Sequence, residues 1–257
     1  MKLSIITINL NNKEGLEKTL NSIQKQRFRD FDYLIIDGNS IDGSQDLIED
    51  FPFKHYYISE KDNGVYDAMN KGIRKSQGEY LLFLNSGDQL HQEDTLQKII
   101  QYLDGTDIVY GNLIFDDRIK PYVHRYPETI TFAHLFESYL PHPASFIKRE
   151  LFEKFGYYDL NYKIAADWAF FTLVIGKHKA STKYIDEIIS VFNLEGLSSN
   201  PENSNLINSE RESFLKKEFS LYYEDYKNLI ENQNTLNRIK SSKGFRILKA
   251  LGVKKFQ

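Results

Sequence analysis

Residues 61–90 run KDNGVYDAMNKGIRKSQGEYLLFLNSGDQL and contain the local patterns on which the expected fold depends. Their apolar spacing predicts a helix near 64–76, and the continuous apolar run at 79–84 predicts a buried strand. The strand ends in the turn NSGD at 85–88, which carries a single carboxylate, Asp88. A helix that leads so directly into a buried strand favours a parallel sheet with crossover helices.

The same alternation extends back to the N-terminus. Strands are expected at 3–8, 32–37 and 54–59, and helices at about 13–26 and 44–51. Strands and helices that alternate in this way form right-handed βαβ units. The ligands of such sheets bind beyond the carboxyl ends of the strands, so this edge is where a site is expected.

Polar side chains stand at or just beyond the end of each of these strands: Thr7, Asn9, Asp37, Glu60, Asp62 and Asp88. Any one of them alone is explained more simply as a helix cap or a turn residue. Because the carboxyl ends of parallel strands share one edge of the sheet, several of them together predict a binding site.

The regular alternation fades after residue 103. An added mixed-sheet section is expected there, with strands at 107–110, 112–115, 122–126 and 144–147 and helices at about 131–137, 148–155 and 166–177. A polar stretch at 194–205 separates this body from helical segments at about 206–233 and 236–251. The predicted fold class is α/β, with a mostly parallel mixed sheet flanked by helices in 1–195 and a helical extension in 196–257.

The composition excludes several classes of function. The 257 residues are 41% hydrophobic and 27% charged, as in a globular protein with a sizeable core. The absence of cysteine excludes disulfides, thiolate nucleophiles and cysteine-based metal sites. The formal net charge of -3 gives no indication of a nucleic-acid partner. No run approaches the roughly 20 apolar residues of a membrane span, and no signal peptide is recognisable, so a cytoplasmic location is expected.

The net charge conceals a strongly basic C-terminus. Residues 238–257 contain seven basic residues and no acidic one, which leaves 26 basic against 36 acidic residues in 1–237. On a helix, Phe245 and Leu248, and Ile247 and Leu251, lie on neighbouring turns and form an apolar strip flanked by positive charge. Such a segment can bind an anionic membrane surface, which is the preferred interpretation, or it can be a solvated tail or dock on the acidic body.

Five motifs in order, SIITINLNN, LIIDGNSIDGS, DNGVYDAMNKGI, GEYLLFLNSGD and ADWAFF, resemble the family 2 glycosyltransferases of the GT-A fold over roughly residues 1–193. Within the family the chain is most similar to bacterial enzymes that build extracellular or surface polysaccharides. The resemblance implies a Rossmann-like domain whose nucleotide-binding half is 1–103 and whose acceptor and catalytic half is 104–195. It also implies metal-dependent, inverting transfer from a nucleotide-diphosphate sugar, with a UDP-sugar preferred, to a glycan or lipid-linked acceptor.

The resemblance implies that six side chains form the nucleotide-sugar pocket: Thr7, Asn9, Asp37, Asp62, Asn70 and Lys71. Thr7 and Asn9 are implied to line the pocket, and Asp37 to accept a hydrogen bond from the base. Asp62, Asn70 and Lys71 are implied to face the ribose or the diphosphate.

A metal site is expected at Asp88, because Mg²⁺ and Mn²⁺ are often held by one or two carboxylates together with substrate phosphates and water. Most members of the family have two or three acids in this motif, whereas NSGD retains one, so a water is expected to replace the missing ligand. His142, in LPHPASF, is implied to complete the metal shell or to touch the acceptor; the alternative is a satisfied structural histidine.

The catalytic assignment falls on Asp167 in ADWAFF. Direct displacement with inversion needs one general base to take the proton of the acceptor hydroxyl and no enzyme nucleophile, and the resemblance assigns this role to Asp167. The alternative is a helix-capping acid. Trp168 could offer its face to an acceptor sugar, although its place beside AFF favours the core.

Two other classes of function remain open from the sequence. A catalytically silent module that binds a sugar nucleotide or a glycan would keep the pocket but lose the base or the metal, and the presence of Asp167 opposes it. A nucleotidyltransferase is the least favoured, because the N-terminus lacks a glycine-rich loop followed by basic residues to hold a triphosphate.

Overall fold

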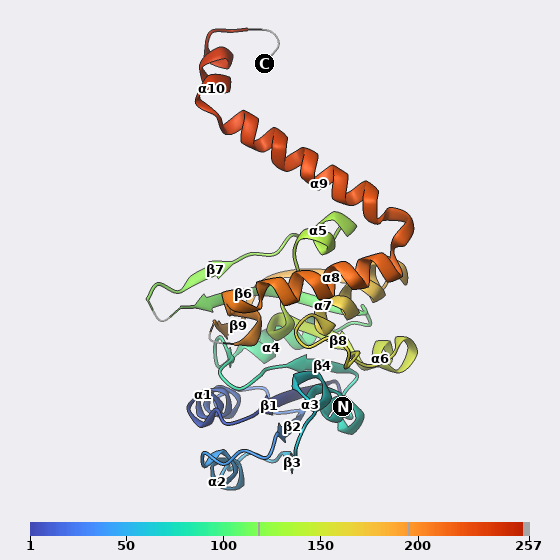
Figure 1. Ribbon diagram of the computed structural model, residues 1–257. Helices are drawn as coiled ribbons and strands as arrows, with labels where there is room; N and C mark the ends of the chain where they lie inside the picture. Colours follow the sequence, from blue (N-terminus) through green and yellow to red (C-terminus); the bar gives the residue numbers. More distant parts are fainter. Residues whose placement is uncertain (118, 195, 254–257) are drawn as a thin grey trace. The chain divides into compact units, whose positions relative to one another are not determined.

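The computed structural model describes residues 1–117, 119–194 and 196–253, and within them it contains one mixed sheet flanked by helices (Figure 1). The strands are β1 (Leu3–Asn9), β2 (Phe31–Asp37), β3 (Tyr56–Ser59), β4 (Tyr80–Phe83), β5 (Gln89–Leu90), β6 (Ile108–Asp116), β7 (Tyr122–His124), β8 (Ser145–Lys148) and β9 (Thr182–Asn193). Their order is β3-β2-β1-β4-β8-β6-β9-β5, and β7 pairs with β6. The predicted α/β class with a mixed sheet is confirmed.

The N-terminal half is the parallel part of the sheet. β1 pairs in parallel with β2 and β4, and β2 pairs in parallel with β3. The connecting helices are α1 (Lys13–Gln24), α2 (Ser44–Glu49) and α3 (Val65–Lys75). Every residue of β1 and β4 is buried, which explains why β4 is a continuous apolar run and why β1 is mostly apolar rather than alternating.

Two glycines set the position of α3. Gly64 immediately precedes the helix with φ 112°, a backbone conformation that favours glycine. Gly72 faces β1, and a Cβ there would lie 2.5 Å from Cγ2 of Ile6. The absence of side chains at these points lets α3 begin sharply and pack closely on the sheet.

The second half of the sheet is mixed. β8 is antiparallel to β4 and β6, whereas β9 is parallel to β6 and antiparallel to β5. The two short strands expected at 107–110 and 112–115 form one strand, β6, that continues through Gly111. β9 was not expected, and its register against β6 shifts on both sides of Asn112. A Cβ on Gly111 would lie 2.7 Å from the carbonyl oxygen of Glu187, so glycine is needed at this bulge.

The remaining helices of this half are short: α4 (Thr95–Ile99), α5 (Phe132–Glu137), α6 (Arg149–Phe155) and α7 (Ala166–Phe171). The helix expected over 166–177 is α-helical only in α7 and continues as a π-helix over Thr172–Lys177. Asp167 therefore lies in the first turn of α7.

The C-terminal segment is helical, with α8 (Ser204–Glu218), α9 (Ser220–Ser241) and α10 (Lys243–Ala250). The contacts divide the chain into two compact units, Met1–Arg211 and Glu212–Gln257. The first unit extends past residue 195 because Glu210 of α8 is hydrogen-bonded to the backbone just before α7. Among the described residues, no helix is long and apolar enough to cross a membrane.

Candidate active site

The carboxyl ends of β1 and β2 hold a closed polar cluster. Asn9 and Asp37 are partners in the strand register, and Nδ2 of Asn9 donates to Oδ1 of Asp37 at 2.8 Å. The Asp37 carboxylate also accepts from the hydroxyl and backbone N–H of Ser40, at 2.6 and 2.8 Å, and from the hydroxyl of Ser59 at 2.7 Å. Asp37 is 0% exposed, so both of its oxygens are occupied within the fold. By contrast, the buried Oδ1 of Asn9 has no hydrogen-bond partner among the described residues.

Thr7 lies deeper in the same strand and is fully buried. Its hydroxyl donates to the carbonyl of Leu84 at 2.8 Å and accepts from the hydroxyl of Tyr33 at 3.0 Å. Burial raises the pKa of Tyr33, which keeps this phenol protonated and a donor to Thr7. Thr7 therefore links β1 to the residue that follows β4, and contact of its side chain with a nucleotide stays a prediction.

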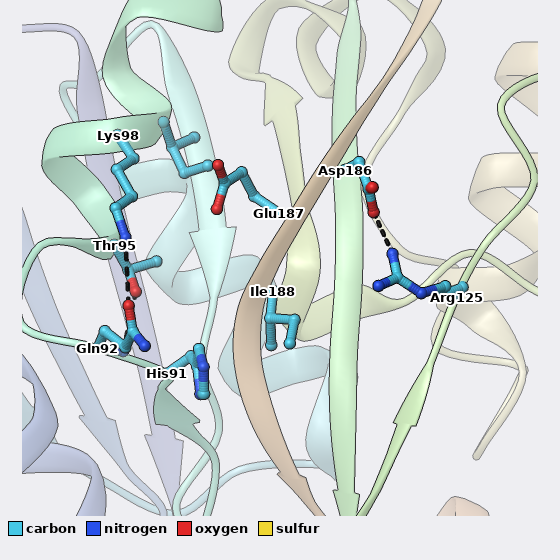
Figure 2. A pocket seen from close by; sticks show the side chains of 9 residues that line it. His91, Gln92, Thr95, Lys98, Arg125, Asp186, Glu187 and Ile188 are labelled. Atoms are coloured by element: carbon cyan, nitrogen blue, oxygen red, sulfur yellow. Dashed lines mark hydrogen bonds and ion pairs between the residues drawn. The ribbon is translucent and has the colours of Figure 1, made fainter.

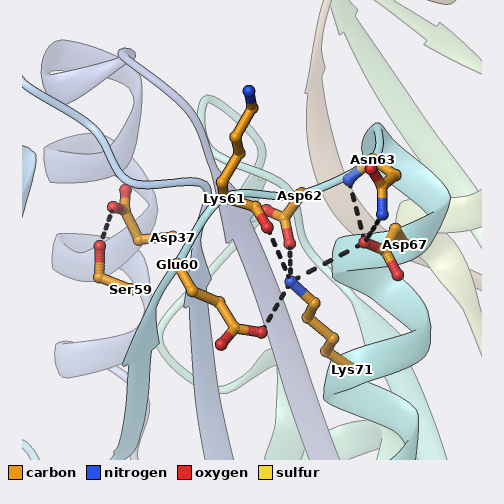
Figure 3. Close-up of polar contacts among 8 residues, drawn as sticks. All are labelled: Asp37, Ser59, Glu60, Lys61, Asp62, Asn63, Asp67 and Lys71. Carbon is orange, nitrogen blue, oxygen red and sulfur yellow. Dashed lines mark hydrogen bonds and ion pairs between the residues drawn. The ribbon is translucent and has the colours of Figure 1, made fainter.

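Lys71 of α3 lies among three carboxylates beyond the end of β3 (Figure 3). Its ammonium is 2.5 Å from Asp62, 2.8 Å from Glu60 and 3.8 Å from Asp67. Burial raises the pKa of Asp62, while the hydrogen bond and charge of Lys71 oppose the rise. Burial alone would lower the pKa of Lys71, but its hydrogen bonds to Asp62 and Glu60 leave it raised. The cluster thus holds Asp62 and Lys71 as an ion pair at the predicted ribose and diphosphate side.

Asn70 has its side chain turned to another part of the chain. Its Nδ2 donates to the carbonyl of Tyr158 at 2.8 Å, and its Oδ1 accepts from the Tyr158 backbone N–H at 3.0 Å. The residue is 2% exposed. Asn70 therefore ties the segment before α7 to α3, and its predicted contact with the donor remains untested.

Asp88 is buried in the turn that follows β4, at 4% exposure. Oδ1 accepts from the backbone N–H of Asn193 at 3.2 Å, and burial raises the pKa of this carboxyl to about 7. Gly87 has φ 108°, and a Cβ there would lie 2.9 Å from Nδ2 of Asn193, which explains the glycine of NSGD. A carboxylate buried without a cation is costly, so the site favours either a proton or a metal ion on Asp88.

The fit of this turn to a divalent cation rests on a second oxygen. The side-chain Oδ1 of Asn85, in the same turn, is buried without a hydrogen-bond partner among the described residues. Carboxylate and amide oxygens are ligand types that Mn²⁺ and Mg²⁺ accept. The described residues contain no group of three or more His, Asp or Glu that could hold a metal ion. A cation held here would therefore take most of its ligands from phosphate and water.

Asp167 lies in a network built from α3, α7 and the segment before β8. Its Oδ1 accepts from the Tyr66 hydroxyl at 2.8 Å, and its Oδ2 is 3.9 Å from Nδ1 of His142. The Asp167 side chain is 28% exposed, so part of the carboxylate faces solvent. Burial and the charge of Asp167 raise the pKa of both Tyr66 and Tyr158, which keeps both phenols protonated.

His142 joins this network to β4, the strand that precedes the turn with Asp88. Its Nε2 is 2.8 Å from the hydroxyl of Tyr158, and its ring stacks on Phe83, the last residue of β4, at 4.6 Å between centroids. Burial lowers the pKa of His142, and Asp167 only partly opposes this, so the imidazole is neutral near pH 7. Because Phe83 leads into the turn that carries Asp88, the Asp167 network and that turn lie at the same end of β4.

Trp168 is covered rather than open to a ligand. It is 3% exposed, and its Nε1 donates to the carbonyls of Leu135 and Ser138 at 2.8 and 2.9 Å. The guanidinium of Arg211 lies 4.6 Å from the ring centroid. Trp168 therefore anchors α7 to the end of α5, and stacking on an acceptor sugar stays a prediction.

Sequence reasoning missed Tyr66, Tyr158, Glu210 and Arg211. Tyr66 and Tyr158 each contact a predicted site residue, while Glu210 binds the backbone before α7. Burial lowers the pKa of Arg211, and the charge of Asp167 opposes this. Tyr66 could have been found, because it lies inside the motif DNGVYDAMNKGI. No local pattern marks Glu210, because its partners are backbone groups distant in the sequence.

A separate cavity of about 230 Å³ lies beside α4 and the bulged part of β9 (Figure 2). Its lining includes His91, Lys98, Arg125, Asp186 and Glu187, and Arg125 pairs with Asp186. None of the predicted site residues lines it. We assign the active site to the sheet edge around Asp88 and Asp167 instead, because α/β sheets bind ligands at the carboxyl ends of their parallel strands.

Comparison with known proteins gives one consistent family. Residues 4–170 match the sequence model of Glycosyl transferase family 2. The chain is 32% identical over 205 residues to a PGL/p-HBAD biosynthesis glycosyltransferase of Mycobacterium bovis, which covers 77% of this chain and 78% of that protein.

Solved structures agree on the fold. S. aureus TarS in complex with UDP-GlcNAc superposes with a TM-score of 0.63 and 18% identity, over 84% of this chain and 67% of that one. Mannosyltransferase PcManGT from Pyrobaculum calidifontis, in complex with GDP-Man and Mn²⁺, superposes with a TM-score of 0.60 and 14% identity. The superposition covers 97% of this chain and 83% of that one. At these identities the likeness concerns the fold.

Proposed function

Since the chain belongs to Glycosyl transferase family 2, we propose that this glycosyltransferase moves a sugar, with inversion, from a nucleotide-diphosphate sugar to a hydroxyl of a glycan or lipid-linked acceptor. The observation that carries the proposal is the Asp167 carboxylate, which is 28% exposed and has its Oδ1 held by Tyr66. One oxygen is thereby oriented, and the other is left for an acceptor hydroxyl.

In the proposed reaction, Asp167 takes the proton of the acceptor hydroxyl while the oxygen of that hydroxyl attacks the anomeric carbon of the donor sugar. The bond from that carbon to the diphosphate oxygen breaks, and the nucleoside diphosphate leaves with the bonding electrons. No enzyme nucleophile is required, which agrees with a single partly exposed carboxylate at this point. His142 stays neutral beside Asp167 and holds its ring against Phe83, so it shapes the site without neutralising the base.

The donor is assigned to the edge formed by β1, β2 and β4. Structural neighbours are complexes with UDP-GlcNAc, UDP and GDP-Man, which supports a nucleotide-sugar donor, and we propose a UDP-sugar. The unpartnered Oδ1 of Asn9 is the acceptor atom available to a base N–H, because Asp37 is fully bonded and positions Asn9. Asp62, Asn70 and Lys71 border the ribose and diphosphate side in this proposal.

Asp88 and Oδ1 of Asn85 are the groups assigned to Mn²⁺ or Mg²⁺, with His142 as a further candidate ligand. When bound, the cation neutralises negative charge that develops on the leaving diphosphate. The burial of Asp88 and the buried, unpartnered oxygen of Asn85 support this assignment.

We further propose that the protein works at the cytoplasmic face of an anionic membrane, to which α10 binds. Ser242 caps the start of this helix. Ile247 lies on the helix and is 59% exposed, and Leu251 lies at its C-terminal end and is 73% exposed. Basic residues flank these apolar side chains, as in helices that lie in a lipid surface.

The test of the function is turnover. Thermal shifts with UDP-, GDP- and dTDP-sugars, with and without Mn²⁺, select the donor, because a ligand that binds only the folded form raises its stability. Release of nucleoside diphosphate from that donor is then compared between the natural protein and Asp167→Asn. We expect at least a 100-fold loss of rate in the variant. Donor binding without turnover by the natural protein would instead support a silent binding module.

A further inference from the structure

Glu210 of α8 lies beyond the part of the chain that matches the family, yet it is bonded into the site region. The residue is 8% exposed. Oε1 accepts from the backbone N–H of Lys163 at 2.7 Å, and Oε2 accepts from those of Ile164 and Ala165 at 3.1 and 3.0 Å. A buried carboxylate is stable only when its oxygens are satisfied, and here three backbone donors satisfy them.

The bonded peptides immediately precede α7, whose first turn carries Asp167. The N–H groups at the start of a helix have no partner within the helix, and Ala165, the residue before α7, has no side-chain cap. Glu210 therefore fixes the point from which α7 departs and, through it, the direction in which Asp167 projects.

A second path leads from Glu210 to Asp167 through Tyr66. The carbonyl of Ile164 and the N–H of Ala165 belong to one planar peptide group. Glu210 accepts from that N–H, while the carbonyl oxygen lies 2.5 Å from the Tyr66 hydroxyl. The same hydroxyl lies 2.8 Å from Oδ1 of Asp167. A phenol has one proton, so the carbonyl of Ile164 and the carboxylate of Asp167 compete for it.

We propose that Glu210 is a positioning residue for Asp167. By accepting a hydrogen bond from the peptide between Ile164 and Ala165, it determines how the Tyr66 proton is shared between the carbonyl of Ile164 and the carboxylate of Asp167. This inference rests on the role of Asp167 in the proposed function. It also makes the middle of α8 part of the active site, although the carboxylate of Glu210 touches neither donor nor acceptor.

The test uses the full chain with the sugar nucleotide selected by thermal shift, and it follows the release of nucleoside diphosphate. Glu210→Ala and Glu210→Gln are compared with Glu212→Gln, a neighbouring acid of α8 whose side chain bonds Lys216 and Tyr223 instead. For each protein, kcat, the KM for donor, the pH profile of kcat and the affinity for UDP with Mn²⁺ are measured.

We expect kcat to fall roughly 10- to 100-fold in Glu210→Ala, because small misplacements of a catalytic group cost this much. Glu210→Gln, which keeps one acceptor oxygen, should fall less. UDP affinity and the donor KM should stay within about twofold of the natural values. The acidic limb of the kcat profile should move to lower pH, because a freed peptide no longer draws the Tyr66 proton from Asp167. Glu212→Gln should leave all four quantities unchanged.

A merely structural role for Glu210 gives a different result: kcat would fall in proportion to the folded fraction, with an unshifted pH profile. That outcome, or an unchanged kcat in Glu210→Gln and Glu210→Ala, would overturn the proposal while leaving Asp167 as the base. Equal activity of Asp167→Asn and the natural protein would overturn the proposed function itself, so the two failures are distinguishable.

Discussion

Tyr66 and Asp167 are 101 positions apart in the sequence and are joined by a hydrogen bond of 2.8 Å from the phenol to Oδ1. The bond links α3, which belongs to the parallel half of the sheet, to α7, which belongs to the mixed half. In the proposed reaction, this bond orients the base relative to a donor bound at the parallel half, as inverting displacement requires.

Replacing Tyr66 by phenylalanine tests this link. The variant keeps the buried ring but removes the hydroxyl that donates to Asp167, so the carboxylate becomes free to rotate. We expect kcat to fall roughly 10-fold with little change in donor affinity, since the lost bond orients the base. Steady-state kinetics with the selected donor measures both. Tyr157→Phe is the matched control, because Tyr157 is 38% exposed and packs on Arg74; an equal loss there would contradict the prediction.

Asp88 should make the metal-free protein less stable as the pH rises. Burial raises its pKa from 3.8 to about 7 in the folded state, so the folded chain binds this proton more tightly than the unfolded chain does. The associated stability is fully present below pH 4 and is lost as the pH rises through about 7. The shift corresponds to on the order of 4 kcal/mol at most. Denaturant unfolding between pH 5 and 8 in EDTA should show the decline, and Asp88→Asn should flatten it.

The same carboxylate links pH to metal binding. A cation must displace the proton from Asp88, so we expect the affinity for Mn²⁺ in the presence of UDP to rise as the pH passes through about 7. Calorimetric titrations at pH 6 and pH 8 measure this. Affinity that is equal at both values, or that persists in Asp88→Asn, would remove Asp88 from the metal site.

The parallel half of the fold could be predicted from sequence, and β9 could not. β1 and β4 are short, mostly apolar runs bounded by turn signals, so their pattern indicates both type and burial. β9 contains Asp186 and Glu187 in its middle, which interrupts any alternation. The structure accommodates these acids in the bulge opposite Gly111, a tertiary arrangement that local periodicity does not encode.

The candidate site shows a similar division. The sequence predicted a metal-binding role for Asp88 and a catalytic role for Asp167, because each stands in a recognisable motif at an element's end, and both roles stay predictions. It did not predict that Asp37 is saturated by Asn9, Ser40 and Ser59, because this depends on side-chain geometry across three strand ends. The role of Glu210 could not be predicted for another reason. Nearly all residues have a backbone N–H group, so a carboxylate that binds such groups is not marked by any partner residue type in the sequence.

Lys71 should stabilise the fold by neutralising the carboxylates around it. Lys71→Met leaves Asp62, which is only 10% exposed at its side chain, without a counter-charge beside Glu60 and Asp67. We expect a loss of roughly 1–3 kcal/mol in unfolding free energy. The loss should be larger at pH 8 than at pH 5, because protonation relieves the unpaired acids. Lys98→Met, which breaks the more exposed pair with Asp94, should cost less than about 1 kcal/mol. Equal losses in both variants would contradict the special role of the Lys71 cluster.

Removal of the basic tail should release the protein from anionic lipid. A chain that lacks residues 238–257 loses seven basic residues, each worth up to about 1 kcal/mol near such a surface, together with the exposed apolar side chains of α10. We expect the full chain to co-sediment with vesicles that contain phosphatidylserine but not with neutral vesicles. Raising the ionic strength should weaken binding, because salt screens the attraction.

Lys216→Ala with Lys217→Ala removes exposed charge outside the tail and should preserve binding. Since the truncation leaves Asp88, Asp167 and Glu210 in place, release of nucleoside diphosphate from the soluble donor should continue at the natural rate. Truncated protein that still co-sediments would exclude the tail as the membrane contact.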